Sequence, residues 1–273
     1  MIGFLRSVFI AALIVQPLQL LAQIGYPIYS DDISVPGSHS VQIRVVDYPE
    51  MTSAKRRTMK ETKDTSATQV IDVRQLSIPK KARNEYEKAS RDFQSGKMQS
   101  GIEHLQNVLK IAPNFYAAHF QLGLHYAPFD QAQAEKALIR AAELNPRVAD
   151  PLVVLGFLYL QTSRLNEAIE VLDRAVELDP ASARPLYYLG SGLYEAGQMT
   201  RAENVLKKSL SLDPTIHPVR LILVNIYLKG NKPAEALQEL EAYLKEEPQL
   251  PQTAAALQMR DQLRLHLQAR KSD

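Results

Sequence analysis

The sequence predicts an all-α fold in which five helix pairs stack into a right-handed solenoid, followed by a C-terminal capping helix. The first observation is the spacing of five prolines. Pro113, Pro146, Pro180, Pro214 and Pro248 follow one another at intervals of 33, 34, 34 and 34 residues. A fixed period near 34 residues is typical of proteins built from stacked pairs of helices. A short segment of strands and irregular structure is expected to precede the solenoid.

The second observation is that other residues keep the same register between the prolines. A leucine–glycine pair or its equivalent lies about 24 residues before a closing proline, and an alanine lies twelve residues before it. A leucine follows the alanine four positions later, so the two share one face of a helix. The recurring residues are Leu122-Gly123, Leu155-Gly156, Leu189-Gly190 and Leu223-Val224, with Ala134, Ala168, Ala202 and Ala236, and with Leu138, Leu172, Leu206 and Leu240.

The third unit shows how each interval folds. Its apolar spacing predicts one helix over 150–161 and a second over 165–178. Gly156 and Ala168 are small, which lets the paired helices approach each other closely. Pro180 disfavours helix in the residue before it and so ends the second helix. No unit buries its apolar stripe alone, so neighbouring units are expected to stack.

This pattern resembles the tetratricopeptide repeat, whose motif runs Leu-Gly-x-x-Tyr, then Ala-x-x-x-Phe, then Pro. The resemblance divides the chain into five units: 82–114, 115–147, 148–181, 182–215 and 216–249. The chain departs from the motif in having no tryptophan and in placing leucine where the family has phenylalanine. The resemblance implies an exported bacterial protein of this family, with helix pairs whose first helices line a concave face.

In this family, extended peptides or partner helices bind along that concave face. The resemblance therefore implies a peptide groove, and the side chains assigned to it are largely apolar or aromatic. We expect a hydrophobic or aromatic-containing peptide, and this protein's own N-terminal strands are one candidate; the alternative is that several of these residues pack between units. The predicted groove residues are Tyr86, Phe93, Phe120, Leu124, Phe157, Leu160, Tyr187, Ser191, Tyr194 and Asn225.

The C-terminal residues 250–273 are expected to form a capping helix and a tail. Apolar residues, Ala254, Ala255, Leu257, Leu263 and Leu267, recur in a run that has no second helix to pair with. A solenoid needs a terminal helix that covers the exposed face of its last unit. The alternative is an amphipathic helix that lies on a membrane surface.

Residues 1–22 have the features of a secretory signal peptide. Arg6 is the one cation, a short apolar run follows it, and Ala22 is the small residue expected at the cleavage site. The apolar run is shorter than the roughly 20 residues that a membrane span requires. Leu20 is larger than the residue usually found two positions before cleavage, so an uncleaved membrane anchor is the alternative.

Residues 23–81 are predicted to be a partly disordered linker with two short strands, at about 40–46 and 70–77. Alternating β-branched residues predict the strands. The stretch between them is rich in Thr, Lys, Ser and Arg and has few large apolar residues, which is typical of a linker. Its basic residues are also compatible with binding to phosphate groups or to a lipid surface.

Composition excludes several classes of function. The chain has 273 residues, a net charge of +2 and no cysteine, which excludes disulfide scaffolds, cysteine-ligated metals and thiol catalysis. None of the usual hydrolase, zinc-protease, phosphate-loop or dinucleotide motifs is found, and the six histidines are scattered. We therefore expect no enzymatic activity, no metal, no cofactor and no nucleic-acid partner.

Together these features predict a non-enzymatic protein–protein interaction scaffold of the bacterial envelope. The protein is expected to be exported, into the periplasm or out of the cell. The alternative is an envelope assembly or regulatory subunit that an uncleaved N-terminal segment holds at the inner membrane. Contact with a membrane is expected only in that second case.

Overall fold

The structure is a computed structural model that describes residues 78–246 and 253–272. The predicted signal peptide at 1–22 and the predicted strands at 40–46 and 70–77 lie outside the described residues. Within the described residues the fold is all-α, with eleven helices: α3 Lys80–Gln94, α4 Met98–Ile111, α5 Tyr116–Tyr126, α6 Gln131–Leu144, α7 Asp150–Gln161, α8 Leu165–Leu178, α9 Ala183–Glu195, α10 Met199–Leu212, α11 Pro218–Lys229, α12 Pro233–Glu246 and α13 Thr253–Ser272.

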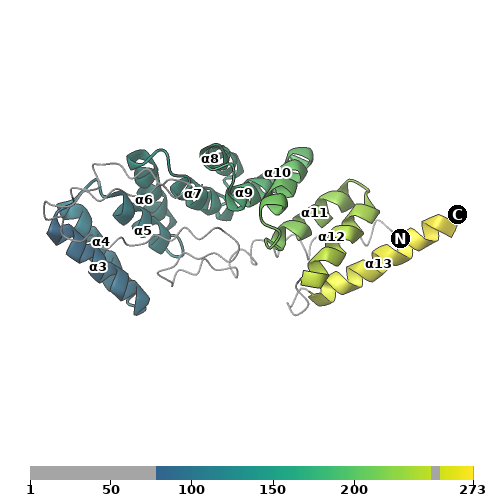
Figure 1. Ribbon diagram of the computed structural model, residues 1–273, viewed down its shortest axis with the longest axis horizontal. Coiled ribbons are helices and arrows are strands. Elements are labelled where there is room, and N and C mark those ends of the chain that lie inside the picture. The colour runs from purple at the N-terminus through teal and green to yellow at the C-terminus, as the bar shows by residue number, and fades with distance from the viewer. Residues whose placement is uncertain (1–77, 247–252, 273) are drawn as a thin grey trace, which may run out of the picture.

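The helices pack in consecutive pairs, and the pairs stack into an elongated row (Figure 1). The two helices predicted for the third unit are α7 and α8, with the predicted bounds. Each second helix also packs against the first helix of the next pair, which joins the units. None of the helices in the described part of the chain is long and apolar enough to cross a bilayer.

The close approach of paired helices depends on the glycines of the motif. A Cβ atom added to Gly123, Gly156 or Gly190 would overlap the side chain of Leu138, Leu172 or Leu206 on the second helix of the same pair. Each of these leucines is 0% exposed. The recurring pair of glycine and leucine is therefore explained by packing. Glycine has no side chain, and this leaves room for the leucine of the paired helix.

A hydrogen-bonded ion pair joins the second unit to the third. Tyr159 Oη donates to Glu135 Oε1 at 2.8 Å, and Arg164 Nη1 lies 2.7 Å from Glu135 Oε2. The Arg164 guanidinium also lies over the Tyr159 ring, 4.1 Å from its centroid. Arg164 and Tyr159 both hold the pKa of the Glu135 carboxyl below its usual value by hydrogen bonding.

The arrangement recurs between the fourth and fifth units. Glu203 on α10 lies beside Tyr227 on α11, and Lys232 Nζ is 3.7 Å from the Glu203 carboxylate. Between the third and fourth units Ile169 stands at the position of Glu135 and Leu193 at that of Tyr159, and an exposed ion pair between Arg201 and Asp173, at 2.6 Å, joins α10 to α8.

We expect Tyr159→Phe to lower the free energy of unfolding by about 1–2 kcal/mol, because it removes a hydrogen bond to a charged carboxylate. Urea denaturation followed by circular dichroism measures the change. Tyr126→Phe is the matched control, since Tyr126 occupies the same repeat position and accepts only a neutral hydrogen bond from Gln106, at 3.0 Å. Equal losses in the two variants would show that the carboxylate adds nothing to this contact.

The last helix, α13, packs along α12 as a capping helix would. Its buried residues are Ala256, Met259 and Leu263, spaced at three and four positions. The predicted apolar face was partly wrong, because Ala255 and Leu257 are exposed while Met259 is buried. On the α12 side this contact covers Tyr243, which is 1% exposed.

Candidate functional site

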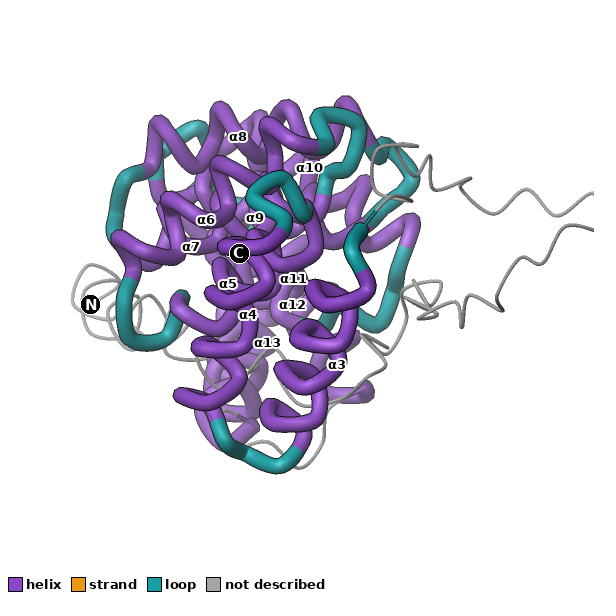
Figure 2. The backbone as a smooth tube through the Cα atoms, turned by 90° about the vertical axis from the view of Figure 1, so that its left-hand side faces the viewer, coloured by secondary structure: helices purple, strands orange, loops and turns teal. Residues whose placement is uncertain are grey.

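The first helices of the pairs lie along one side of the row. The row bends into an arch, and α6, α8 and α10 follow its outer edge over the middle of the molecule (Figure 1). Helix α9 contacts both α7 and α11, so three first helices lie side by side on the inner face. Viewed along the row, successive pairs are rotated relative to one another (Figure 2). We call the surface formed by the first helices, α3, α5, α7, α9 and α11, the concave face.

The predicted groove residues divide into two groups by exposure. Tyr86, Leu124 and Phe157 are half-buried and reach the surface. The others are buried within the wall behind it, and they are Phe93, Phe120, Leu160, Tyr187, Ser191, Tyr194 and Asn225. Three of the ten predicted groove residues therefore reach the surface, and seven do not.

Aromatic rings gather at two places along the first helices. Near the N-terminal end, Tyr86 lies against Phe115, with ring centroids 5.1 Å apart. In the middle, Tyr188 contacts both Phe157 and Tyr187, at centroid distances of 5.4 and 5.0 Å. Sequence reasoning missed Phe115 and Tyr188, because neither lies at a position where the family motif marks the groove. Burial raises the pKa of Tyr86 to about 12, so its phenol is a neutral donor.

Phe93, although predicted to line the groove, is buried at the contact between the first and second units. Its ring stacks on the imidazole of His125, with centroids 3.5 Å apart and planes 13° apart, and so joins the first unit to the second. His125 is 3% exposed, and its Nδ1 has no hydrogen-bond partner among the described residues. Burial lowers the pKa of His125 to about 4, which keeps the ring neutral at physiological pH.

Several polar groups lie in the C-terminal half of α9. Ser191 Oγ donates to the backbone oxygen of Tyr187 at 2.9 Å. Tyr194 Oη is buried and finds no hydrogen-bond partner in the described part of the chain. Lys229 on α11 places its ammonium 4.4 Å from the centroid of the Tyr194 ring. Glu195, the last residue of α9, is exposed to solvent.

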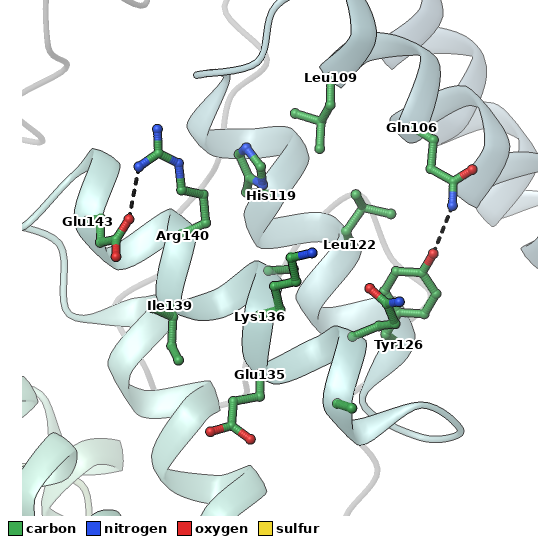
Figure 3. A pocket seen from close by; sticks show the side chains of 13 residues that line it. Gln106, Leu109, His119, Leu122, Tyr126, Glu135, Lys136, Ile139, Arg140 and Glu143 are labelled. Atoms are coloured by element: carbon green, nitrogen blue, oxygen red, sulfur yellow. Dashed lines mark hydrogen bonds and ion pairs between the residues drawn. The ribbon is translucent and has the colours of Figure 1, made fainter.

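A hollow of about 610 Å³, which we call the α4–α6 hollow, lies between α4, α5 and α6 (Figure 3). Leu109, Leu122 and Ile139 are among its apolar lining residues. Its polar side chains are largely engaged within the protein: Arg140 pairs with Glu143 at 2.9 Å, and His119 is hydrogen-bonded to the Pro113 carbonyl oxygen. The hollow therefore offers an apolar surface with few free polar groups.

Within residues 78–246 and 253–272, no three His, Asp or Glu side chains are grouped so that they could hold a metal ion. The histidines lie apart from one another: His104 bonds to Glu85, and His125 is stacked on Phe93.

Comparisons with known proteins agree with this fold. A family model described as "Tetratricopeptide repeat" matches residues 193–260, and one described as "TPR repeat" matches residues 156–195. No curated protein sequence matches the chain.

Solved structures give the same result over a longer stretch. MamA from Desulfovibrio magneticus RS-1 is 20% identical, with a TM-score of 0.59 over 63% of this chain and 98% of its own. PilW, titled a widely conserved type IV pilus biogenesis factor, is 20% identical, with a TM-score of 0.57 over 70% of this chain and 94% of its own. YrrB, titled a TPR protein with an unusual peptide-binding site, is 17% identical, with a TM-score of 0.56 over 65% of this chain and 92% of its own.

At these levels of identity the likeness establishes the fold alone. The family models, the 34-residue period and the paired helices nevertheless agree, and residues 156–260 match the tetratricopeptide repeat.

Proposed function

We propose that this protein is an interaction scaffold of the bacterial envelope that binds an extended peptide segment of a partner along its concave face. One observation carries the proposal: apolar side chains on the first helices of four different units are only partly buried and remain accessible along this face. They are Tyr86, Leu124, Phe157 and Leu228. Exposed apolar residues in a continuous strip are typical of binding surfaces.

The repetition of the units favours an extended partner. The same repeat positions recur on each first helix, so contacts recur from one unit to the next along the face. An extended chain advances about 3.3 Å per residue and can contact several units in succession. The aromatic content also fits, because tyrosine and phenylalanine are enriched at the cores of protein interfaces.

Two observations support a place in the envelope. The apolar run and Ala22 at the N-terminus have the pattern of a signal peptide. PilW, a neighbour in fold, is titled a type IV pilus biogenesis factor. N-terminal sequencing of the protein purified from an envelope fraction tests this placement: a chain that begins at Gln23 supports export with cleavage. A chain that still begins at Met1 and resists salt extraction from membranes would instead support the anchored subunit.

Phe157→Asp and Leu124→Asp are expected to weaken peptide binding by at least tenfold, because each places a charge within the partly buried apolar strip. Peptides selected by the full-length protein from a random library serve as probes, and fluorescence anisotropy gives the dissociation constants. Thermal unfolding of each variant shows that the helix pairs remain folded. Tyr187 and Tyr194 are less suitable positions for this test. Both side chains are 7% exposed, and their truncation to alanine would lower the stability of the fold.

The matched control is Ile139→Asp, which makes the same kind of change in the α4–α6 hollow, where Ile139 is 39% exposed. We expect this variant to bind the peptides as the unchanged protein does. Loss of binding in Ile139→Asp with normal binding in Phe157→Asp would show that the peptide binds in the α4–α6 hollow, and it would overturn the proposal.

A further inference from the structure

The α4–α6 hollow carries an apolar residue where the other units have polar ones. Six of the α6 residues that line it share one face of that helix: Ala132, Gln133, Lys136, Ile139, Arg140 and Glu143. At the same repeat positions α4, α8 and α10 have only polar residues, and α12 has no apolar residue larger than alanine. The position of Ile139 is occupied by Asp173 on α8 and by Glu241 on α12, and each of these acids pairs with an arginine. Ile139 is therefore an exception to the polar outer face of the second helices, and it is 39% exposed.

The apolar surface extends beyond Ile139. Leu109 and Leu122 line the hollow, as does Tyr126. Phe129, in the loop between α5 and α6, is 59% exposed, and its ring centroid lies 5.8 Å from that of Tyr126. A single exposed apolar residue is common on protein surfaces, but several around one hollow are typical of a contact. The volume of about 610 Å³ also lies within the roughly 300–1,000 Å³ of binding pockets.

One charged group among the lining residues has no opposite charge beside it. Glu135 pairs with Arg164 at 2.7 Å. Arg140 pairs with Glu143 at 2.9 Å. Lys136 extends over the hollow (Figure 3), and no hydrogen bond or ion pair joins its ammonium to the described part of the chain. The hollow therefore suits an apolar segment that carries an acidic residue at the rim.

The chain enters the described residues beside this hollow. Ile78 is the first described residue, and it packs against the core cluster of the first two units. Leu122 belongs to that cluster and Leu109 packs against it, and both of these leucines line the hollow. The residues directly before Ile78 are thus tethered close to the hollow. An extended chain advances about 3.3 Å per residue, so residues 70–77 reach as far as about 26 Å from Ile78.

Residues 70–77 have the composition that the hollow requires. They read Val-Ile-Asp-Val-Arg-Gln-Leu-Ser, with β-branched apolar residues on both sides of Asp72. In an extended segment the side chains of Ile71 and Val73 face one side, and that of Asp72 faces the other. Such a segment can therefore place apolar side chains in the hollow and an acid at its rim.

We propose that residues 70–77 dock in the α4–α6 hollow of their own chain. Val73 lies on Ile139 in this arrangement. Asp72 pairs with Lys136 at the rim. The contact fixes the chain before α3 to the second unit and leaves the concave face free for a partner, so the inference does not depend on the proposed function.

Engineered thiol pairs test this contact, because the chain has no cysteine of its own. Val73→Cys is combined with Ile139→Cys in the full-length protein, and mass spectrometry measures the fraction of disulfide in glutathione redox buffers. This fraction gives the effective concentration of one thiol at the other. Val73→Cys with Glu87→Cys is the matched control, since Glu87 is an exposed residue of α3 that is nearer to Ile78 in sequence and does not line the hollow. We expect an effective concentration at least tenfold higher at position 139 than at position 87.

A charge exchange tests the pairing of Asp72 with Lys136. In the chain with thiols at positions 73 and 139, Lys136→Glu should lower the effective concentration about threefold at low salt, because two acids then face each other. Adding Asp72→Lys should restore it. Lys97→Glu makes the same change in net charge at the exposed N-cap of α4, outside the lining of the hollow, and should have no effect.

The outcomes decide between occupants of the hollow. Equal effective concentrations at positions 139 and 87 would mean that the segment does not dock, and the inference fails. Disulfides that join two chains instead of closing within one would assign the hollow to the segment of a second copy, which also overturns it. A high value at position 139 that Lys136→Glu leaves unchanged would show that Asp72 lies elsewhere, and the proposed arrangement would be wrong.

Discussion

Gly156→Val is expected to lower the free energy of unfolding by about 3 kcal/mol. A Cβ atom at this position would overlap the side chain of Leu172, which is 0% exposed and enclosed on all sides. The leucine has no free volume to move into, so α7 and α8 would have to separate. Urea denaturation followed by circular dichroism measures the loss.

A double variant tests whether this overlap is the cause. Leu172→Ala alone should cost about 2–5 kcal/mol through the cavity that it leaves. Combined with Gly156→Val, the loss should be clearly smaller than the sum of the two single losses, because the valine fills part of the cavity. Gly230→Ala is the control: the nearest atoms to an added Cβ there lie at ordinary contact distance, 3.4 Å, and its stability should change little. Additive losses at 156 and 172 would contradict the steric explanation.

The same pair of residues shows how much of the fold the sequence predicts. The proline period and the Leu-Gly and Ala-x-x-x-Leu markers locate both helices of the third unit to the residue, at 150–161 and 165–178. The fifth unit is harder to predict, because Val224 replaces the glycine while Leu240 remains 1% exposed.

The candidate site is less predictable than the helices. Position relative to the glycine indicates on which face of its helix a residue lies, and it placed Phe157 and Leu124 on the concave face. It does not indicate how far the next unit closes over a residue, which depends on the rotation between units. Tyr187 and Tyr194 therefore lie deeper than their repeat positions suggest, each 7% exposed.

Acidification is expected to destabilise the first two units through His125. Burial lowers the pKa of this imidazole from its ordinary value of 6.5 to about 4. Above pH 6.5 the ring is neutral in both folded and unfolded chains, and it contributes no pH dependence. As the pH falls from 6.5 to 4, the unfolded chain takes up a proton that the folded chain excludes. The free energy of unfolding should therefore fall, by up to about 3 kcal/mol at pH 4.

His125→Phe should remove this contribution and keep the stack on Phe93. The measurement is the difference in unfolding free energy between pH 7.5 and pH 5, where the histidine accounts for about 2 kcal/mol. His119→Phe is a comparison variant: burial also lowers the pKa of His119, so this change removes a separate contribution in acid and leaves the Phe93–His125 stack in place. Carboxylates such as Glu135, whose pKa is lowered by Arg164, lose their stabilising effect at lower pH and are left in place in both variants.

The location of the effect gives a second, independent readout. In a solenoid each unit contacts only its neighbours, so a charge between the first and second units should open those units first. Amide hydrogen exchange at pH 5 should accelerate in α3, α4 and α5, which surround the Phe93–His125 stack, before it does so in α9 and α10. His125→Phe should slow exchange in the first three helices alone. Uniform acceleration along the row, unchanged in the variant, would mean that the loss in acid arises from groups other than His125.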